Sequence, residues 1–186
     1  MPDSIVDGSG QNNKARVGSS LKLDVSARVN DRIYYASRND KKAFIVQMHL
    51  TQASGAATEA IGYLKYTGSE RINIKQITVT SEDPGMTAFG IWKNPTVSGG
   101  TELTPVNLNF SSNIPSDTEA KDSQSTITIT DGESIQTIRM DGPDSKVIDL
   151  YDAVILGTNN IIAIKGQAST TGSKIRVNIM FAESVD

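Results

Sequence analysis

The chain has 186 residues and no cysteine, and its 18 basic residues against 21 acidic ones give a net charge of −3. The lack of cysteine excludes disulfides, thiolate metal sites and a cysteine nucleophile. The balanced charge, with no basic cluster larger than Lys41-Lys42, disfavours nucleic acid as a partner.

No stretch of the sequence reaches the roughly 20 apolar residues that a membrane helix needs, so no membrane partner is predicted. The first residues lack the positive start and the apolar centre of a signal peptide. We therefore expect a protein that is made in a cytoplasm and assembled there.

Residues 1–20 are rich in Gly, Ser, Asn and Asp and carry almost no apolar pattern. Such a segment buries too little surface to offset its ordering entropy, which predicts a flexible N-terminal arm. From Leu21 to Val29 apolar and polar residues alternate, as in a strand with one buried face. We expect residues 21–186 to form a single β-sandwich domain, because all-β units of this size are common.

Alternation with a period of two recurs along the rest of the chain, and each run predicts a further strand. The clearest runs are Phe44–Leu50, Ile72–Val79, Val106–Phe110, Ile127–Ile129 and Ile175–Phe181. In the second of these runs, Ile72 and Ile74 have the opposite phase to Ile77 and Val79. This change of phase predicts a β-bulge near Lys75-Gln76.

Turn signals separate the runs, and no window of helical length has a convincing apolar stripe. The turns are marked by Asp83-Pro84-Gly85, Gly99-Gly100, Asp131-Gly132, Asp141-Gly142-Pro143 and Gly157-Thr158-Asn159-Asn160. Many short strands at fairly even spacing predict an all-β fold. The expected architecture is an antiparallel β-sandwich, and a jelly roll is the economical arrangement of eight or more strands.

The stretch 91–109 holds Trp92, the single tryptophan of the chain, and the pair Gly99-Gly100. We predict that the two glycines reverse the chain, so that Thr101–Phe110 returns as the second strand of a long hairpin with Trp92 capping the end of the sandwich. Two alternatives stay open for Trp92. It could form an aromatic platform for a sugar ring, or it could contact another subunit.

Some predicted strands are apolar on both faces, most clearly Ile161–Ile164. A sandwich strand needs only one buried face, so something else must cover the second one. A loop, a terminal arm or another subunit could provide this cover, and the last of these would make the protein an oligomer.

The residues with reactive side chains do not form a catalytic or metal-binding motif in the sequence. His49, the only histidine, falls on the polar face of its strand, where we expect it to be solvated. The carboxylates at Asp117–Asp122 and at Asp141 and Asp144 lack EF-hand spacing, which favours plain acidic loops over calcium sites. A glycosidase needs only two carboxylates, so residue types alone leave that chemistry open. The sequence predicts no enzyme, no cofactor and no catalytic or metal site.

Four blocks of the sequence form a set: Tyr34–Arg38, Tyr63–Thr67, Ile91–Asn109 and Ile161–Phe181. The third contains Trp-Lys-Asn-Pro-Thr and Thr-Pro-Val-Asn-Leu-Asn, and the fourth contains Gly-Ser-Lys-Ile-Arg-Val-Asn-Ile. Together these blocks resemble auxiliary virion proteins of tailed bacteriophages, and the similarity extends over roughly residues 15–183. Such proteins are β-sandwiches that decorate the viral head or belong to a tail or a fibre.

The resemblance implies a decoration (cement) protein with no catalytic residues. Its expected partners are the major capsid protein, on the exterior of the capsid, and copies of itself, commonly in a homotrimer. Bridging the capsid subunits would stabilise the assembled shell, and the arm at 1–20 would thread between them. The main alternative is a tail- or fibre-associated module of the same fold that binds host-surface carbohydrate through Trp92 and tyrosines. A glycan hydrolase is a third hypothesis.

Overall fold

The computed structural model describes residues 4–6, 14–17, 23–24, 36–55 and 57–184, and the chain divides into two compact units, 1–30 and 31–186. In the first unit, β1 (Ser4–Val6), β2 (Lys14–Val17) and β3 (Leu23–Asp24) form a three-stranded antiparallel sheet. Most of the predicted flexible arm at 1–20 and of the predicted strand Leu21–Val29 lies outside the described residues, so both stay predictions, as does a domain boundary at residue 20.

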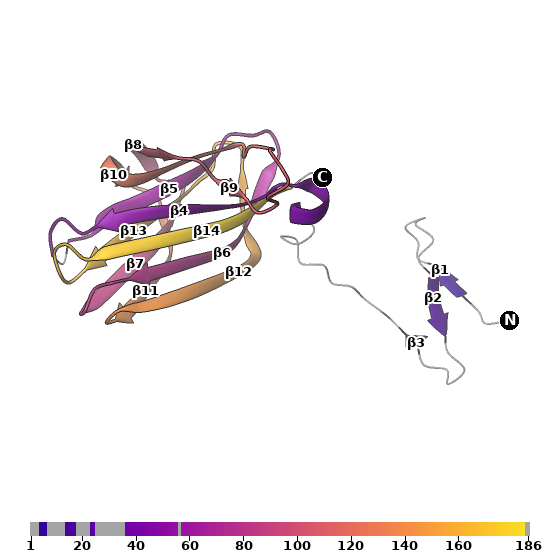
Figure 1. Cartoon of the computed structure of the whole chain (residues 1–186), viewed down its shortest axis with the longest axis horizontal. Coiled ribbons are helices and arrows are strands. Elements are labelled where there is room, and N and C mark those ends of the chain that lie inside the picture. The colour runs from indigo at the N-terminus through magenta and orange to yellow at the C-terminus, as the bar shows by residue number, and fades with distance from the viewer. Residues whose placement is uncertain (1–3, 7–13, 18–22, 25–35, 56, 185–186) are drawn as a thin grey trace. The chain divides into compact units, whose positions relative to one another are not determined.

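The second unit contains one short π-helical turn and two antiparallel sheets (Figure 1). The elements are η1 (Ala36–Asp40), β4 (Ala43–Thr51), β5 (Glu59–Tyr66), β6 (Arg71–Ser81), β7 (Met86–Lys93), β8 (Thr96–Leu103), β9 (Val106–Asn107), β10 (Thr118–Thr130), β11 (Glu133–Asp141), β12 (Asp144–Gly157), β13 (Ile161–Ala168) and β14 (Lys174–Ser184). The five-stranded sheet has the order β12-β6-β14-β4-β9, and the six-stranded sheet has the order β11-β7-β13-β5-β10-β8.

The strand order is that of a jelly roll with one insertion. Four strands, β4 to β7, pair in reverse sequence with the last four: β4 with β14, β5 with β13, β6 with β12 and β7 with β11. Each pair lies within one sheet, and successive pairs alternate between the two sheets, as two nested Greek keys require. Strands β8, β9 and β10 are inserted between β7 and β11. The predicted antiparallel β-sandwich is therefore confirmed.

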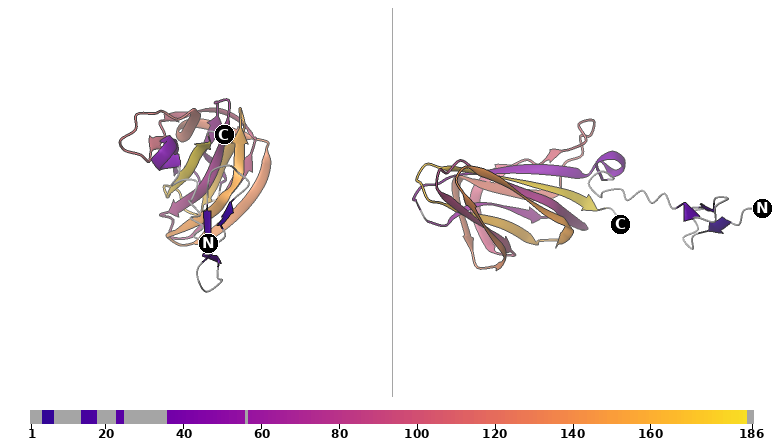
Figure 2. Two further views of the ribbon diagram at one scale, coloured as in Figure 1. Left: turned by 90° about the vertical axis from the view of Figure 1, so that its right-hand side faces the viewer. Right: turned by 90° about the horizontal axis from the view of Figure 1, so that it is seen from below.

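The core lies between the two sheets, which an end-on view shows as two layers (Figure 2, left). The predicted alternation holds in the two central strands of the five-stranded sheet. Phe44, Val46, Met48 and Leu50 of β4 are buried, and so are all four inward residues of β14: Ile175, Val177, Ile179 and Phe181. The rings of Phe44 and Phe181 stack with their centroids 5.6 Å apart.

The predicted bulge near Lys75-Gln76 is also present. Met180 of β14 is paired with Gln76, but the next residue, Phe181, is paired with Ile74, so Lys75 is the extra residue on β6. The bulge lets isoleucines on both sides of it face the core, and Ile72, Ile74 and Ile77 are each fully buried.

The predicted hairpin at residues 91–109 is wrong. Gly99 and Gly100 have φ values of 71° and 89°, but the chain does not reverse there, and β8 continues through them to Leu103. On the partner strand β10, Asp122 is paired with Thr101 and Ile127 is paired with Gly99. The residues between Asp122 and Ile127 therefore form a bulge. The glycines therefore bend the β8–β10 pair, and β7 does not pair with β8.

The predicted strand at Thr101–Phe110 is wrong in its last part. Only Val106 and Asn107 form β9, which pairs with β4 at the edge of the five-stranded sheet. Leu108 turns inward and packs against Ala36, Ala43 and Ala182, whereas Phe110 lies in the following loop and is 90% exposed.

Candidate functional site

The outer face of the six-stranded sheet carries a second apolar cluster. Tyr63, Ala163 and Ile129 are its buried members, and Trp92, Val97, Ile127, Ile161 and Ala60 pack against them. Val97 belongs to β8, and Ile127 and Ile129 belong to β10. Of the three covers that the sequence left open, the one observed here is therefore a segment of the same chain, the β8–β10 insertion.

Trp92 lies in this outer cluster and not in the core between the sheets. The ammonium group of Lys165 lies 4.3 Å from the centre of its ring, within range of a cation–π interaction. Because a side chain of the same molecule occupies that face of the ring, Trp92 does not offer it as a free stacking platform.

A polar groove of about 900 Å³ runs beside this cluster, between the bulged part of β10 and the start of β5. Its walls carry the hydroxyl groups of Thr58, which directly precedes β5, and of Ser125, Thr126 and Thr128 on β10, together with Gln124 and Lys165. The carboxylate of Glu59, also at the groove, accepts hydrogen bonds from the backbone N–H groups of Ala53 and Ser54. The groove offers hydrogen-bonding groups to a neutral polar ligand.

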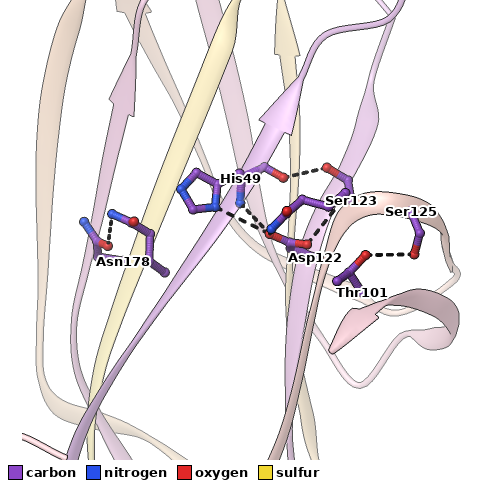
Figure 3. Close-up of polar contacts among 8 residues, drawn as sticks. His49, Thr101, Asp122, Ser123, Ser125 and Asn178 are labelled. Carbon is purple, nitrogen blue, oxygen red and sulfur yellow. Dashed lines mark hydrogen bonds and ion pairs between the residues drawn. The ribbon is translucent and has the colours of Figure 1, made fainter. Parts of the chain in front are cut away.

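His49 lies on the outer face of β4, as its phase predicts, but its side chain is only 40% exposed (Figure 3). Its Nδ1 lies 3.5 Å from Oδ2 of Asp122, whose side chain is fully buried. The Asp122 carboxylate also accepts hydrogen bonds from the backbone N–H of His49 at 3.2 Å and from the side chain of Gln124 at 2.9 Å.

Ser123 stands next to this pair, so the cluster contains the residue types of a serine hydrolase. Its hydroxyl, however, donates to the backbone carbonyl of His49 at 2.6 Å and not to the imidazole ring (Figure 3). The contacts therefore connect β10 to β4 at the edge of the sandwich, and they do not activate the serine as a nucleophile would require.

The acidic residues at 117–122 contact different partners. Glu119 accepts a hydrogen bond of 2.8 Å from the Tyr63 hydroxyl and lies 3.1 Å from the ammonium group of Lys121. Burial and the bond to Glu119 raise the pKa of the Tyr63 hydroxyl. Asp144, near the other candidate loop, lies 3.8 Å from Lys146. Among the side chains that the structure describes, no three from His, Asp and Glu are placed to hold a metal ion together.

Glu183 is a buried carboxylate that fixes the end of the loop between β9 and β10. It is 2% exposed, and its Oε1 accepts hydrogen bonds from the Ser116 hydroxyl at 2.6 Å and from the backbone N–H of Asp117 at 2.8 Å. Burial raises the pKa of this carboxyl above its ordinary value, and the charge of Asp117 adds to the rise, against the two hydrogen bonds.

This raised pKa gives a pH-dependent prediction. A carboxyl whose folded-state pKa lies above its ordinary value of 4.5 stabilises the fold below that pH and loses the contribution as pH rises through the folded pKa. As the pH rises from about 4 to 7, we expect the unfolding free energy of Glu183→Gln to increase relative to that of the wild type. Urea denaturation at both pH values measures this. The matched control Glu133→Gln, at a side chain 80% exposed, should show no such gain; equal pH profiles for wild type and Glu183→Gln would contradict the assignment.

Large apolar side chains on the surface gather at two places. In the part of the chain with described side chains, six of the seven exposed ones lie on β9 and its following loop or on the edge strands β11 and β12: Val106, Phe110, Ile114, Ile135, Val147 and Ile155. We call the first three the β9 group and the last three the β11–β12 group. They lie at opposite ends of the strand order in the sheets.

Comparisons with known proteins add little to this geometry. No protein-family model matches the chain, and no curated protein matches it. Among solved structures it is similar to the VP2 subviral particle of infectious bursal disease virus, with 12% identity and a TM-score of 0.19 over 78% of this chain. The chain spans 42% of the length of that VP2 chain, and a TM-score this low does not establish a common fold. No described helix has the length and apolar character to cross a membrane.

Proposed function

We propose that the chain is a non-enzymatic structural protein of a virus particle. In this proposal it decorates the exterior of the capsid, bridges neighbouring capsid subunits and works as a homo-oligomer, with a trimer as the expected form. The likeness of its sequence blocks to auxiliary virion proteins of tailed bacteriophages supports the proposal. The jelly roll is compatible with it, but the same fold also serves unrelated functions.

The observation that carries the proposal is the grouping of exposed apolar side chains at the two edges of the sandwich. Single apolar residues on a surface are ordinary, whereas groups of them mark protein contacts. Phe110 is 90% exposed, Val147 60% and Val106 55%, values that favour burial against another protein. Two separate groups allow one molecule to contact two neighbours at once, which bridging requires.

The stabilising effect follows from linkage. A protein that binds the assembled shell, and not the separate subunits, lowers the free energy of the assembled state by its own binding free energy. A stable contact of this kind buries about 1,200 Å² or more in total. In this proposal residues 1–20 thread between capsid subunits and add contact area, and deletion of this segment should weaken capsid binding.

The copy number of the chain in purified virus particles tests this function. Quantitative mass spectrometry should find the chain in filled and empty heads, at a copy number close to that of the major capsid protein or a fixed fraction of it. Its absence from heads, or a few copies confined to tails, would contradict a decorating role.

The polar groove beside β10 supports a second candidate, a tail- or fibre-associated module that binds host-surface carbohydrate. Its hydroxyl and amide groups match the hydrogen-bonding needs of a neutral saccharide. If the purified chain binds glycans on an array, Thr128→Val should abolish the binding. The control variant Val147→Ser, at an exposed residue outside the groove, should retain it. That result would favour this candidate. No binding to any glycan would remove it.

A further inference from the structure

An apolar cleft opens between β11 and the second half of β12. Its volume is about 310 Å³, and seven of its ten lining residues are apolar. Three of the lining isoleucines differ in their exposure: Ile135 and Ile155 are 47% and 49% exposed, whereas Ile162 is buried. The other three lining residues are Lys93, Asn94 and Asn160.

The cleft exists because β12 departs from the regular ladder. Asp149 is paired with Gln76 of β6, but the next pair is Val154 with Ile74, so β12 has several extra residues opposite Lys75. This bulge sets Val154 and Ile155 beside β11 of the other sheet while the two edge strands remain unpaired on their outer sides.

The cleft is an apolar hollow, whereas Phe110 is an apolar side chain that is exposed to solvent. Phe110 is 90% exposed and belongs to the loop that follows β9. This loop projects from the sandwich (Figure 2). The tip, residues 110–114, has the sequence Phe-Ser-Ser-Asn-Ile and carries no charge. An uncharged tip of this kind can enter an apolar cleft without desolvating a charge.

The loop is fixed in place by the side chains of two asparagines. Asn109 accepts a hydrogen bond at Oδ1 from the backbone N–H of Ser111 and donates from Nδ2 to the carbonyl of Ser37 at 2.8 Å. Asn107 donates to the carbonyls of Lys41 and Ile114. A loop that is ordered before binding loses little conformational entropy when it binds, which is what an anchor residue needs.

Phe110 and the apolar cleft lie at opposite edges of the sandwich. In the five-stranded sheet β9 and β12 are the two edge strands, with β4, β14 and β6 between them (Figure 1). Four strand spacings of about 4.8 Å separate the edges, so Phe110 does not reach the cleft of its own molecule.

We propose that Phe110 of one copy inserts into the apolar cleft between β11 and β12 of the next copy. The cleft has room, since a cavity of roughly 150 Å³ holds a benzene ring. Every copy carries one exposed Phe110 and one cleft, so the contact is head to tail. Such a contact closes into a ring when the rotation between copies permits. This inference rests on the homo-oligomer of the proposed function and names its contact.

Site-directed cross-linking tests the contact directly, because the chain has no cysteine of its own. Full-length Ser111→Cys, which leaves Phe110 in place, and Ile155→Cys proteins are oxidised separately and as a mixture. We expect a covalent dimer in the mixture alone, and a closed covalent oligomer from the double variant. No cross-link in the mixture, or a dimer of Ser111→Cys with itself, would overturn the proposal.

Sedimentation velocity provides the second measurement. Phe110→Ser should weaken self-association about tenfold or more, as removal of an aromatic anchor does, and leave the fold of the chain unchanged. The matched control Val147→Ser, at a residue 60% exposed on β12 but outside the cleft, should associate like the wild type. A wild-type chain that stays monomeric at every concentration would overturn the contact between Phe110 and the cleft. The copy number in virus particles would still decide whether the chain decorates the capsid.

Discussion

Replacing Phe181 by alanine is expected to lower the free energy of unfolding by about 3–5 kcal/mol. Phe181 is fully buried in β14, the central strand of the five-stranded sheet, and its ring stacks on Phe44. It also faces Ile74, next to the bulge in β6, where the backbone is already displaced from the regular ladder. The lost ring would leave a cavity that the two flanking strands cannot close, which is why the effect is large.

Urea denaturation at a fixed protein concentration measures this change, with two companion variants. Phe181→Leu retains most of the volume and should lose less than about 1.5 kcal/mol. Val147→Ala, at an exposed residue of the same sandwich, should change stability by less than about 0.5 kcal/mol. Similar losses for Phe181→Ala and Val147→Ala would contradict the position of the core between the two sheets.

Replacing Asp83 by asparagine is expected to cost about 3 kcal/mol near neutral pH, the second largest effect. Asp83 is fully buried in the turn between β6 and β7. Its carboxylate accepts hydrogen bonds from the backbone N–H groups of Gly85, Ser169 and Thr170 and from the Ser169 hydroxyl. These bonds join the β6–β7 turn to the β13–β14 turn. An asparagine amide would direct its own N–H₂ group toward some of these donors.

The pH dependence of the Asp83 effect has a defined sign. Burial alone would raise the pKa of this carboxyl, but the hydrogen bonds from Gly85, Thr170 and Ser169 outweigh it and hold the pKa below its ordinary value of 3.8. The contribution of Asp83 is therefore present above pH 3.8 and is lost as pH falls through the lower folded-state pKa. The difference in stability between wild type and Asp83→Asn should shrink below that pH. A difference that stays constant from neutral pH to the acid limit would be contrary to this assignment, and the exposed Asp144→Asn serves as the control.

The sequence predicted the sandwich well because its strands obey simple alternation. The strands β4 and β14 lie at the centre of a sheet with one face on the core, so their apolar residues repeat every second position without interruption. The phase change between Ile74 and Ile77 identified the bulge in β6 for the same reason, since an extra residue is the simplest way to keep both on the core side.

The inserted segment was harder to predict. Val106, Leu108 and Phe110 alternate like a strand, but the side chains of Asn107 and Asn109 form hydrogen bonds to nearby backbone groups and end β9 after Asn107. Gly99-Gly100 has the composition of a turn, and both residues do adopt positive φ. Only the position of β10 beside β8 shows that they bend a strand pair and do not reverse the chain.

The surface features that matter for function depend on residues distant in the sequence. The cleft joins β11, β12 and β13, and the contacts of His49 with Asp122 link residues 73 positions apart. Asp83 and Ser169, which are 86 positions apart, are a further example. Periodicity reports only which face of one strand is buried, so it contains no information about which strands meet at an edge. The alternation of Val106, Leu108 and Phe110 accordingly predicts a strand that extends to Phe110, whereas Phe110 lies in a loop and is 90% exposed.

A reconstruction of the virus particle at side-chain resolution tests the central claim most directly. The account predicts density for the jelly roll on the outside of the capsid, with protein covering both the β9 group and the β11–β12 group. Within an oligomer, Phe110 of each copy should lie in the cleft of its neighbour. Particles without the chain, or a bound chain whose two apolar groups both face solvent, would contradict it.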